Sequence, residues 1–219
     1  MKKKHYAVIG LGRFGSSVAN TLLQAGQEVL VIDADDKIVQ KMADYFTHAV
    51  VADTTDEATL KSLGLRNFDI VIVAIGHNVS ASVLTVLLLK EIGVPHIIAK
   101  ADNHMHGKML EKVGADQVIF PERDMGLRIA HNLLSTNVID YFEVAKDLAI
   151  IEVKVPEQLI GMNLVETDLR SRYEITVIAI RRSGVMMLTP KPEEKFERDD
   201  ALILVGANGG IQKFEDTYF

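Results

Sequence analysis

The strongest constraint on the fold of this 219-residue chain is a regular alternation between residues 6 and 120. Short runs rich in β-branched residues are each followed by a longer segment with helical spacing of apolar residues. A helix between successive strands forces them to pair in parallel. The predicted strands are 6–9, 28–32, 48–52, 69–74, 96–100 and 117–120, and the predicted helices 14–25, 36–45, 57–63, 81–92, 105–113 and 125–134. The pattern predicts an α/β, Rossmann-like doubly wound sheet with a ligand crevice beyond the carboxyl ends of its strands.

Beyond residue 137 the rhythm changes, and strands dominate. Two of the runs flank a Ser183-Gly184 turn, which is typical of a hairpin. A short amphipathic segment covers 164–172, and the runs rich in β-branched residues are 148–155, 175–182, 185–190 and 201–206. We therefore expect a nucleotide-binding domain over 1–138 and a small α+β domain over 139–219.

Composition excludes several classes of protein. Lys and Arg number 24 against 30 Asp and Glu, so the net charge of −6 disfavours binding to DNA or RNA. The absence of Cys rules out disulfides and thiolate chemistry and fits the cytosol. No run approaches the roughly 18 apolar residues of a membrane span. The longest apolar stretch, residues 79–89, follows Asn78 and is typical of a capped, buried helix.

A glycine motif, Gly10-Leu11-Gly12-Arg13-Phe14-Gly15, directly follows the first predicted strand. In this position the glycines allow a tight turn and close approach of the backbone to a pyrophosphate. Asp33 ends the second strand, where its carboxylate can accept the ribose hydroxyls and would repel a 2′-phosphate. These residues predict an adenine nucleotide other than NADP. The alternative is a purely structural glycine turn, with Asp33 capping the next helix.

Arg13 and Phe14 occupy positions inside this motif, and both are candidate cofactor-binding residues. A guanidinium binds phosphate through two parallel hydrogen bonds. Arg13 can therefore reach a terminal phosphate on its own nucleotide or on one held by a neighbouring subunit. The alternative is a solvated Arg at the start of a helix.

Small and polar residues follow the third and fourth predicted strands, at the edge where an adenosine is expected. Asp53 and Thr54 lie past the third strand, and Ala74, Ile75 and Gly76 past the fourth. Gly76 leaves room for a close approach of ligand. For Asp53 and Thr54, capping of the helix that begins near Glu57 is an equally good explanation.

Other candidate motifs carry less information. The acidic turn 121–124 is explained by the dipole of the helix that it opens. His104 and His106 lie two apart, so on a helix they point to different faces and do not predict a zinc site. The remaining histidines give no catalytic spacing. We expect no enzymatic activity and no catalytic residues.

Taken together, VIGLGRFG, Asp33, ADTTD, NFDIVIVAIG, KEIGV, VGAD and PERDMG resemble the TrkA-type RCK family. The likeness covers nearly the whole chain and is greatest to the cytosolic gating subunits of bacterial Ktr potassium transporters. Its most specific parts are GLGRFG and PERDMG, since the glycine pattern alone occurs in many dehydrogenases. The C-terminal part resembles the small RCK_C domain.

The resemblance implies a homo-octameric ring, built from dimers and docked at the inner face of the cell membrane under a dimeric potassium pore protein. ATP would open the pore and ADP would close it. In this family the matching arginine, Arg13, senses the terminal phosphate of ATP, and Asp33 would hold the ribose. Lys100 would lie near the phosphates. Glu122 would bind a divalent cation, Mg²⁺ or Ca²⁺, together with its symmetry mate at the dimer interface.

The resemblance also implies a site for cyclic di-AMP in the RCK_C dimer. Relatives often carry Asn where Thr176 stands, and apolar residues of this segment could equally form a dimer core. The matching residues are Leu164, Val165, Leu169, Arg170, Ser171, Ile175, Thr176, Val177 and Pro190.

Two other functions compete with this interpretation. An NAD-dependent oxidoreductase or NAD(H) sensor fits the glycine turn equally well, but residues beyond 140 offer no evident proton donors for hydride transfer. A redox-sensing DNA repressor needs a basic helix-turn-helix, which the charge balance and the strand-rich C-terminal part do not supply.

Overall fold

The computed structural model describes residues 4–134 and 137–219. They form two compact units, Met1–Arg123 and Asp124–Phe219, and each is described by itself. Most of helix α6 (Pro121–Leu134) belongs to the second unit, although the sequence-based division falls at residues 138 and 139. That division stays a prediction about where the domains can be separated. Within the described residues, no helix has the length and apolar character needed to cross a bilayer.

The first unit is built on a six-stranded parallel sheet with the order β3-β2-β1-β4-β5-β6. The chain starts in the middle, winds outward to β3, and then returns to the other side of β1. The reversal between β1 and β4 leaves a crevice at the carboxyl ends of the strands. The strands are β1 (His5–Ile9), β2 (Glu28–Asp33), β3 (His48–Val51), β4 (Ile70–Val73), β5 (Ile97–Lys100) and β6 (Gln117–Ile119). The predicted doubly wound fold is confirmed.

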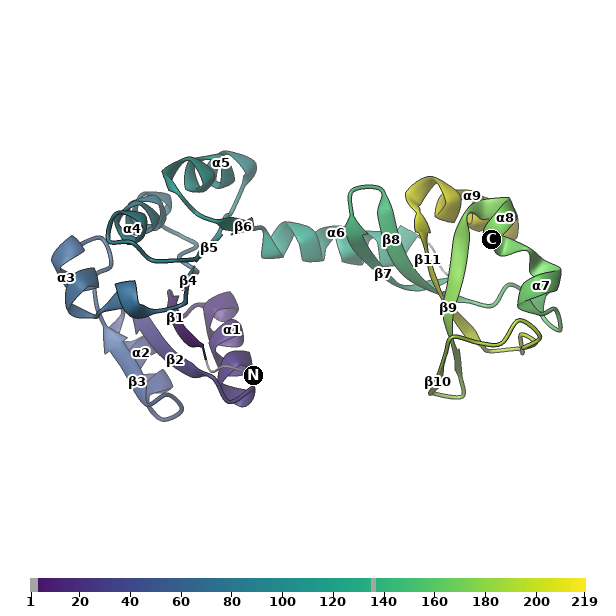
Figure 1. Cartoon of the computed structure of the whole chain (residues 1–219), viewed down its shortest axis with the longest axis horizontal. Coiled ribbons are helices and arrows are strands. Elements are labelled where there is room, and N and C mark those ends of the chain that lie inside the picture. Colours follow the sequence, from purple (N-terminus) through teal and green to yellow (C-terminus); the bar gives the residue numbers. More distant parts are fainter. Residues whose placement is uncertain (1–3, 135–136) are drawn as a thin grey trace. The chain divides into compact units, whose positions relative to one another are not determined.

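Alternating strand residues feed two separate cores, because successive side chains point to opposite faces of a sheet. In β1, Ala7 and Ile9 pack with the cluster that contains Leu89 and Leu110, whereas Val8 packs with the cluster that contains Ala19. Helices therefore cover both faces (Figure 1). The helices of this unit are α1 (Arg13–Gln24), α2 (Asp36–Ala43), α3 (Glu57–Ser62), α4 (Val79–Glu91) and α5 (His104–Val113), with a 3₁₀ turn at Leu65–Asn67.

The second unit contains a five-stranded antiparallel sheet with the order β10-β9-β11-β8-β7. Its strands are β7 (Val138–Ala145), β8 (Leu148–Lys154), β9 (Ile175–Arg182), β10 (Val185–Leu188) and β11 (Ala201–Ala207). Its other elements are a 3₁₀ turn at Glu157–Leu159 and helices α7 (Leu164–Thr167), α8 (Leu169–Tyr173) and α9 (Asn208–Tyr218). The predicted hairpin is present, and β9 pairs with β10 across Ser183 and Gly184.

Two elements of this unit escaped the sequence analysis. β7 is an edge strand whose charged residues, Asp140 and Glu143, mask its alternation. α9 opens with Asn-Gly-Gly, which is more typical of a turn than of a helix. The spacing of Ile211, Phe214 and Tyr218 is the helical signal that could have found it, because all three pack with the core of the unit.

An ion pair joins α6 to β7. Arg128 donates from Nε to Asp140 Oδ1 at 2.9 Å, and its terminal nitrogen donates to the second carboxylate oxygen. These bonds lower the pKa of Asp140 to about 2, against the opposing effect of its burial. His131 of α6 also stacks on Tyr141, with ring centroids 4.1 Å apart. Both contacts hold α6 against the antiparallel sheet of the second unit.

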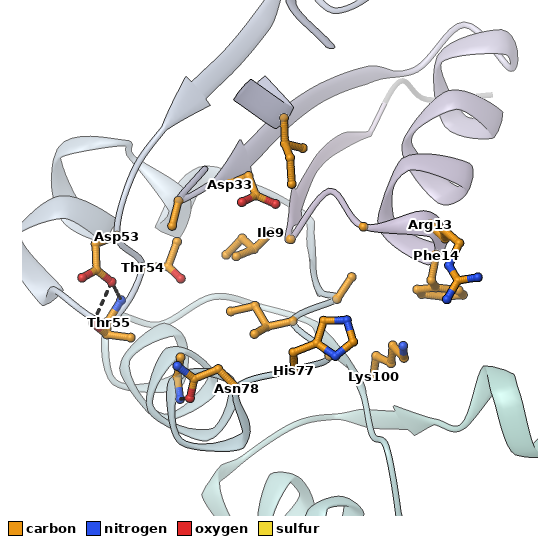
Figure 2. A pocket seen from close by; sticks show the side chains of 18 of the residues that line it. Ile9, Arg13, Phe14, Asp33, Asp53, Thr54, Thr55, His77, Asn78 and Lys100 are labelled. Carbon is orange, nitrogen blue, oxygen red and sulfur yellow. Dashed lines mark hydrogen bonds between the residues drawn. The ribbon is translucent and has the colours of Figure 1, made fainter. Parts of the chain in front are cut away.

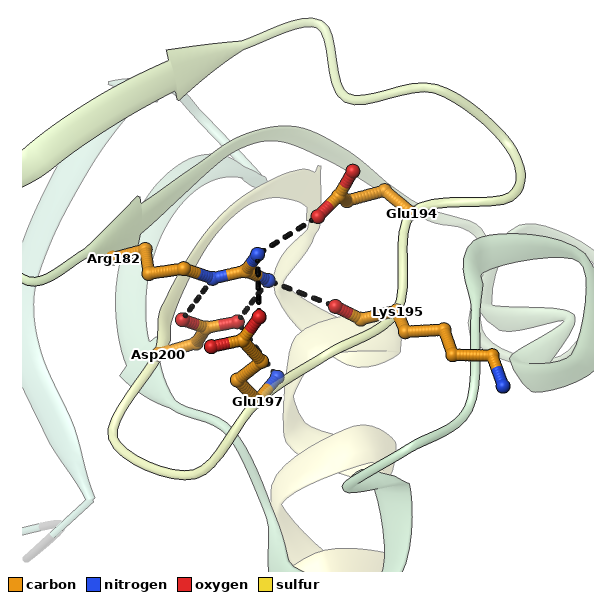
Figure 3. Close-up of polar contacts among 5 residues, drawn as sticks. All are labelled: Arg182, Glu194, Lys195, Glu197 and Asp200. Atoms are coloured by element: carbon orange, nitrogen blue, oxygen red, sulfur yellow. Dashed lines mark hydrogen bonds and ion pairs between the residues drawn. The ribbon is translucent and has the colours of Figure 1, made fainter.

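A network of charges closes the loop between β10 and β11 (Figure 3). Asp200 is only 1% exposed, and Arg182 donates to its two oxygens at 2.9 and 2.8 Å. Arg182 also binds the carboxylates of Glu194 and Glu197 and the backbone carbonyl of Lys195. Burial alone would raise the pKa of Asp200, but the bonds from Arg182 and the backbone outweigh it and the pKa is lowered. The buried carboxylate therefore stays charged and depends on Arg182.

We expect Arg182→Met to lower the free energy of unfolding by about 3–5 kcal/mol, because it leaves a buried charge without its partner. Arg181→Met is the matched control. Arg181 pairs with the more exposed Glu152, so its loss should cost about 1 kcal/mol or less. Urea denaturation of the two variants tests this, and equal losses would contradict the assigned role of Asp200.

Candidate functional site

The glycine motif forms a tight loop between β1 and α1. Gly10 has φ of +89°, and a Cβ there would lie 2.9 Å from the carbonyl carbon of Ala74. A Cβ on Gly15 would lie 1.9 Å from the carbonyl oxygen of Gly10, so α1 packs directly on the loop. Gly12 has no atom within 4 Å of a Cβ position and faces open space. The first and last glycines are thus required by packing, and the middle one leaves the loop accessible.

Asp33 fixes the loop from the end of β2. Its Oδ2 accepts the N–H of Leu11 at 2.6 Å, and its Oδ1 accepts the N–H of Asp35 at 2.9 Å. A carboxylate has about four lone-pair sites, so both oxygens can still accept ribose hydroxyls. The alternative role of Asp33 as a helix cap is wrong, because Asp35 caps α2 by accepting the N–H of Lys37.

The amino end of α1 is open to an anion. Gly12 is the N-cap residue and supplies no side-chain cap, and the first turn carries no acidic residue. The N–H groups of this turn that lack intrahelical partners are therefore available, and the helix dipole favours negative charge there. Arg13, the first helical residue, adds an exposed cation at the same end.

These elements surround a crevice of about 390 Å³. Figure 2 shows Arg13 and Lys100 toward one end of it and Asp53, Thr55 and Asn78 toward the other, with Asp33 between. Both cations thus lie at the end where α1 begins, together with the carboxylate of Glu122. The lining residues are Ile9, Gly10, Gly12, Arg13, Phe14, Asp33, Ala34, Ile38, Ala52, Asp53, Thr54, Thr55, Ala74, Ile75, Gly76, His77, Asn78, Ala81, Lys100 and Glu122.

The turn after β3 is held by its own side chains. Asp53 accepts from the N–H and hydroxyl of Thr55, and these bonds lower its pKa. Thr54 is buried, with its hydroxyl 2.9 Å from that of Thr85 on α4. The residue that caps α3 is Asp56, so the alternative that Asp53 or Thr54 does so is wrong.

The charged end of the crevice contains a short ion pair. Lys100 Nζ donates to Glu122 Oε1 at 2.5 Å and lies 4.0 Å from Asp102 Oδ1. The hydrogen bond from Lys100 is the main cause of a lowered pKa at Glu122, and Arg13 adds to it. Gly76 makes room for this arrangement, since a Cβ there would come within 3.3 Å of Lys100 Nζ.

The crevice brings together nearly all the residues expected from the first domain. Gly15 is the exception, because it is buried and serves the packing of α1. The sequence analysis did not select His77 or Asn78, although Asn78 was expected as a helix cap and does accept the N–H of Ala81. Their signal was the same as that of Gly76, namely a place just past β4.

All the residues expected to bind cyclic di-AMP except Pro190 lie in α7, α8 and β9. Leu169 and Ile175 pack in the core of the second unit, whereas Val165 is exposed. The N–H of Thr189 donates to the carbonyl of Ile178, which continues the β9–β10 ladder toward Pro190. The others, at the surface or partly buried, are Leu164, Arg170, Ser171, Thr176 and Val177.

Comparisons with known proteins cover both units. The TrkA-N domain family matches residues 6–121, and the TrkA-C domain family matches residues 148–217. Ktr system potassium uptake protein C of Bacillus subtilis (strain 168) is 47% identical over 213 residues, which are 97% of this chain and 96% of that protein. Ktr system potassium uptake protein A of the same organism is 44% identical over 216 residues, covering 99% and 97%.

Among solved structures, the GsuK channel matches 99% of this chain and 40% of its own, with a TM-score of 0.72 and 19% identity. The GsuK channel bound to NAD matches 100% and 39%, with a TM-score of 0.54 and 22% identity. GsuK bound to ADP matches 57% and 33%, with a TM-score of 0.51 and 20% identity. This chain therefore spans less than half of that channel, and at these identities the likeness shows the fold alone.

The glycine loop offers a matched pair of substitutions. Gly15→Ala should lower the free energy of unfolding by about 1–3 kcal/mol or more, because the new Cβ meets the Gly10 carbonyl. Gly12→Ala meets no atom and should cost less, about 0.5–1 kcal/mol, because alanine is a poorer N-cap residue than glycine. Denaturation curves of both variants test the assignment, and a Gly15→Ala protein as stable as Gly12→Ala would contradict it.

Proposed function

The chain belongs to the family of TrkA-N and TrkA-C domain proteins that includes the Ktr potassium uptake proteins, and from this premise we propose that it is a nucleotide-gated regulatory subunit of a membrane potassium transporter. ATP activates the transporter and ADP inactivates it. The relatives are potassium uptake proteins rather than enzymes, which agrees with the expectation of a non-enzymatic chain.

The observation that carries this proposal is the charge distribution of the crevice. The uncapped start of α1, Arg13 and Lys100 supply positive potential at one end, and Asp33 lies further along. A nucleoside polyphosphate has the complementary arrangement, with phosphates beyond a ribose that donates hydroxyl groups. The residues present therefore fit ATP and ADP.

Discrimination between ATP and ADP follows from the ion pair at the charged end. Lys100 is bound to Glu122, and Arg13 is close enough to lower the pKa of Glu122. A terminal phosphate competes with Glu122 for these two cations, whereas the shorter ADP leaves them with the carboxylate. A ligand shifts a conformational equilibrium only through different affinities for the two states, and this exchange supplies such a difference.

Release of Glu122 from Lys100 would also free its carboxylate to bind a divalent cation. The described residues of one chain contain no group of three or more His, Asp or Glu side chains arranged to hold a metal. Glu122 alone is therefore a partial site, and Mg²⁺ or Ca²⁺ would need a second carboxylate or phosphate oxygens. In the proposed dimer the symmetry-related Glu122 provides the second carboxylate.

The wider assembly is proposed from family membership. The subunits form an octameric ring from dimers, which docks at the cytoplasmic face of the cell membrane on a potassium pore protein. Cyclic di-AMP binds the C-terminal dimer along α7, α8 and β9 and inhibits transport. The exposed Val165 and Thr176 suit such an interface, whereas the buried Leu169 and Ile175 support it from the core.

An NAD(H) sensor is the second candidate, since NAD has the same adenosine half. The cationic end of the crevice favours phosphates over a nicotinamide nucleoside, because the side chains of Arg13 and Lys100 bind oxyanions. NADP is disfavoured by the carboxylate of Asp33.

Replacing Arg13 with Ala should compress the affinity difference between ATP and ADP. An Arg–phosphate pair worth about 2 kcal/mol corresponds to roughly thirtyfold discrimination. Isothermal titration calorimetry with both nucleotides measures the ratio, and Arg66→Ala, which leaves the crevice lining intact, is the control. An unchanged ratio in Arg13→Ala would count against the sensing role.

Glu122→Gln should abolish the stabilisation of the ATP-bound protein by divalent cations, because it removes the charge on which the shared site depends. Thermal melts with ATP, with and without Mg²⁺ or Ca²⁺, measure the effect. Glu111→Gln, an exposed acid on α5, is the control and should keep the cation response. A retained response in Glu122→Gln would remove this residue from the cation site.

A further inference from the structure

A buried histidine stands next to the charged end of the crevice but does not line it. His106, in the first turn of α5, is 1% exposed. Its Nδ1 accepts the backbone N–H of Asp102 at 3.3 Å. Its Nε2 is buried and has no hydrogen-bond partner among the described residues. Because Nδ1 is an acceptor, the proton of the neutral ring lies on Nε2.

The backbone that His106 holds carries the side chains of the charged end. Asp102 follows β5 by two residues, and its Oδ1 lies 4.0 Å from Lys100 Nζ. Lys100 in turn binds Glu122 and lines the crevice. A Cβ on Gly76 would come within 3.7 Å of Asp102 Oδ1, so the turn after β5 lies directly against the turn after β4. His106 is therefore connected to Lys100 through the turn after β5, because it contacts the backbone of Asp102, whose side chain lies near Lys100.

We propose that His106 is a positioning residue for the phosphate end of the crevice: neutral His106 holds the turn after β5 in its binding geometry, and protonated His106 releases it. The inference rests on the proposed nucleotide function and adds to it a dependence on pH. Nucleotide binding then weakens as the surroundings become acidic.

The chemistry of the ring explains the release. An imidazolium carries hydrogen on both nitrogens, so Nδ1 can no longer accept from Asp102 and its new hydrogen faces another donor. The carboxylate of Asp102 is the nearby group that attracts the charged ring, and turning toward it takes that carboxylate away from Lys100. Protonation thus exchanges a backbone contact for a side-chain contact and moves the turn.

Burial lowers the pKa of His106, and the charge of Asp102 only partly offsets this. Among the elements packed near the ring, α6 brings the guanidinium of Arg123 over the ring of Phe120, which lies against Gly107. β6 has no titratable side chain, and Lys90 of α4 packs on Gly114 at the far end of α5, where it pairs with Asp116. On α5 itself the neighbouring His104 and Lys108 are exposed. Lys100, at the end of β5, is bound to Glu122.

The sign of the pH effect follows from the lowered pKa. The unfolded chain binds a proton at His106 near the ordinary pKa of about 6.5, before the folded chain does. The stability of the fold is therefore complete above that pH and decreases as the pH falls through and below it. Nucleotide affinity follows the same direction, because the protonated ring also loses the Asp102 contact.

The test compares ATP affinity at about pH 7.5 and about pH 5.8 in wild type, His106→Asn and His106→Phe. The amide oxygen of Asn can occupy the place of Nδ1 and accept from Asp102, but it does not titrate. Wild type should weaken in acid more than His106→Asn, by at most about fivefold, because a pKa below about 6.5 leaves part of His106 neutral at pH 5.8. His106→Phe has no acceptor. Its affinity for ATP should therefore be lower than that of wild type at neutral pH by a similar factor, and it should stay equally low in acid.

Two other groups at the ligand, the terminal phosphate of ATP and the imidazole of His77, need their own controls. The terminal phosphate of ATP contributes equally in every variant, and His77→Asn removes the imidazole that lines the crevice. Thermal melts at both pH values show that each variant is folded, and the result with His106→Asn decides the inference if His106→Phe does not fold. A residue with a merely structural role would change the melting temperature without changing the pH profile of binding.

The outcomes separate the two proposals. Wild type that binds ATP with a steeper acid loss than His106→Asn supports the inference. Equal pH profiles in these two proteins, with binding intact at neutral pH, overturn the inference and leave the proposed function standing. A wild-type protein that binds neither ATP nor ADP at neutral pH contradicts the proposed function and this inference together.

Discussion

The carboxylate of Asp33 ties together the parts on which the crevice depends. One oxygen holds the glycine loop through the N–H of Leu11, and the other holds the turn that leads into α2. The loop in turn fixes the position of the first turn of α1, because Gly15 packs directly on the carbonyl of Gly10 with no side chain between them. A charged group at the end of one strand thereby decides where the open helix end and Arg13 face a ligand.

The sequence alone predicted the first sheet and most residues of the crevice, because the strand pattern, the glycine spacing and Asp33 are signals that lie within short stretches of the chain. It was insufficient where contacts join distant segments. Lys100 and Glu122 lie at the ends of different strands, and only the folded chain pairs them. Asp53 and Asp56 have the same capping chemistry, and the backbone geometry decides that Asp56 caps α3. In the second unit, charges on an edge strand hid β7 from its pattern.

In the proposed function the site redistributes charge without breaking a bond. In the proposed mechanism Lys100 and Arg13 bind either the carboxylate of Glu122 or a terminal phosphate, and the two choices define two states. In the same proposal a divalent cation would favour the state in which Glu122 is released, because it would supply the positive charge that the carboxylate then lacks. His106, as proposed above, would act on the same side chains through the backbone of Asp102. The binding of a nucleotide, a cation or a proton would thus change the contacts of the same small group of side chains.

The most direct test of this account is a competitive binding measurement on the purified full-length protein with ATP, ADP, NAD and NADH, followed by analysis of the recovered nucleotides. The account predicts that ATP and ADP displace the dinucleotides at lower concentrations than the reverse, and that ATP is recovered intact. Tight binding of NADH with weak binding of ATP would contradict it, and so would steady conversion of the bound nucleotide.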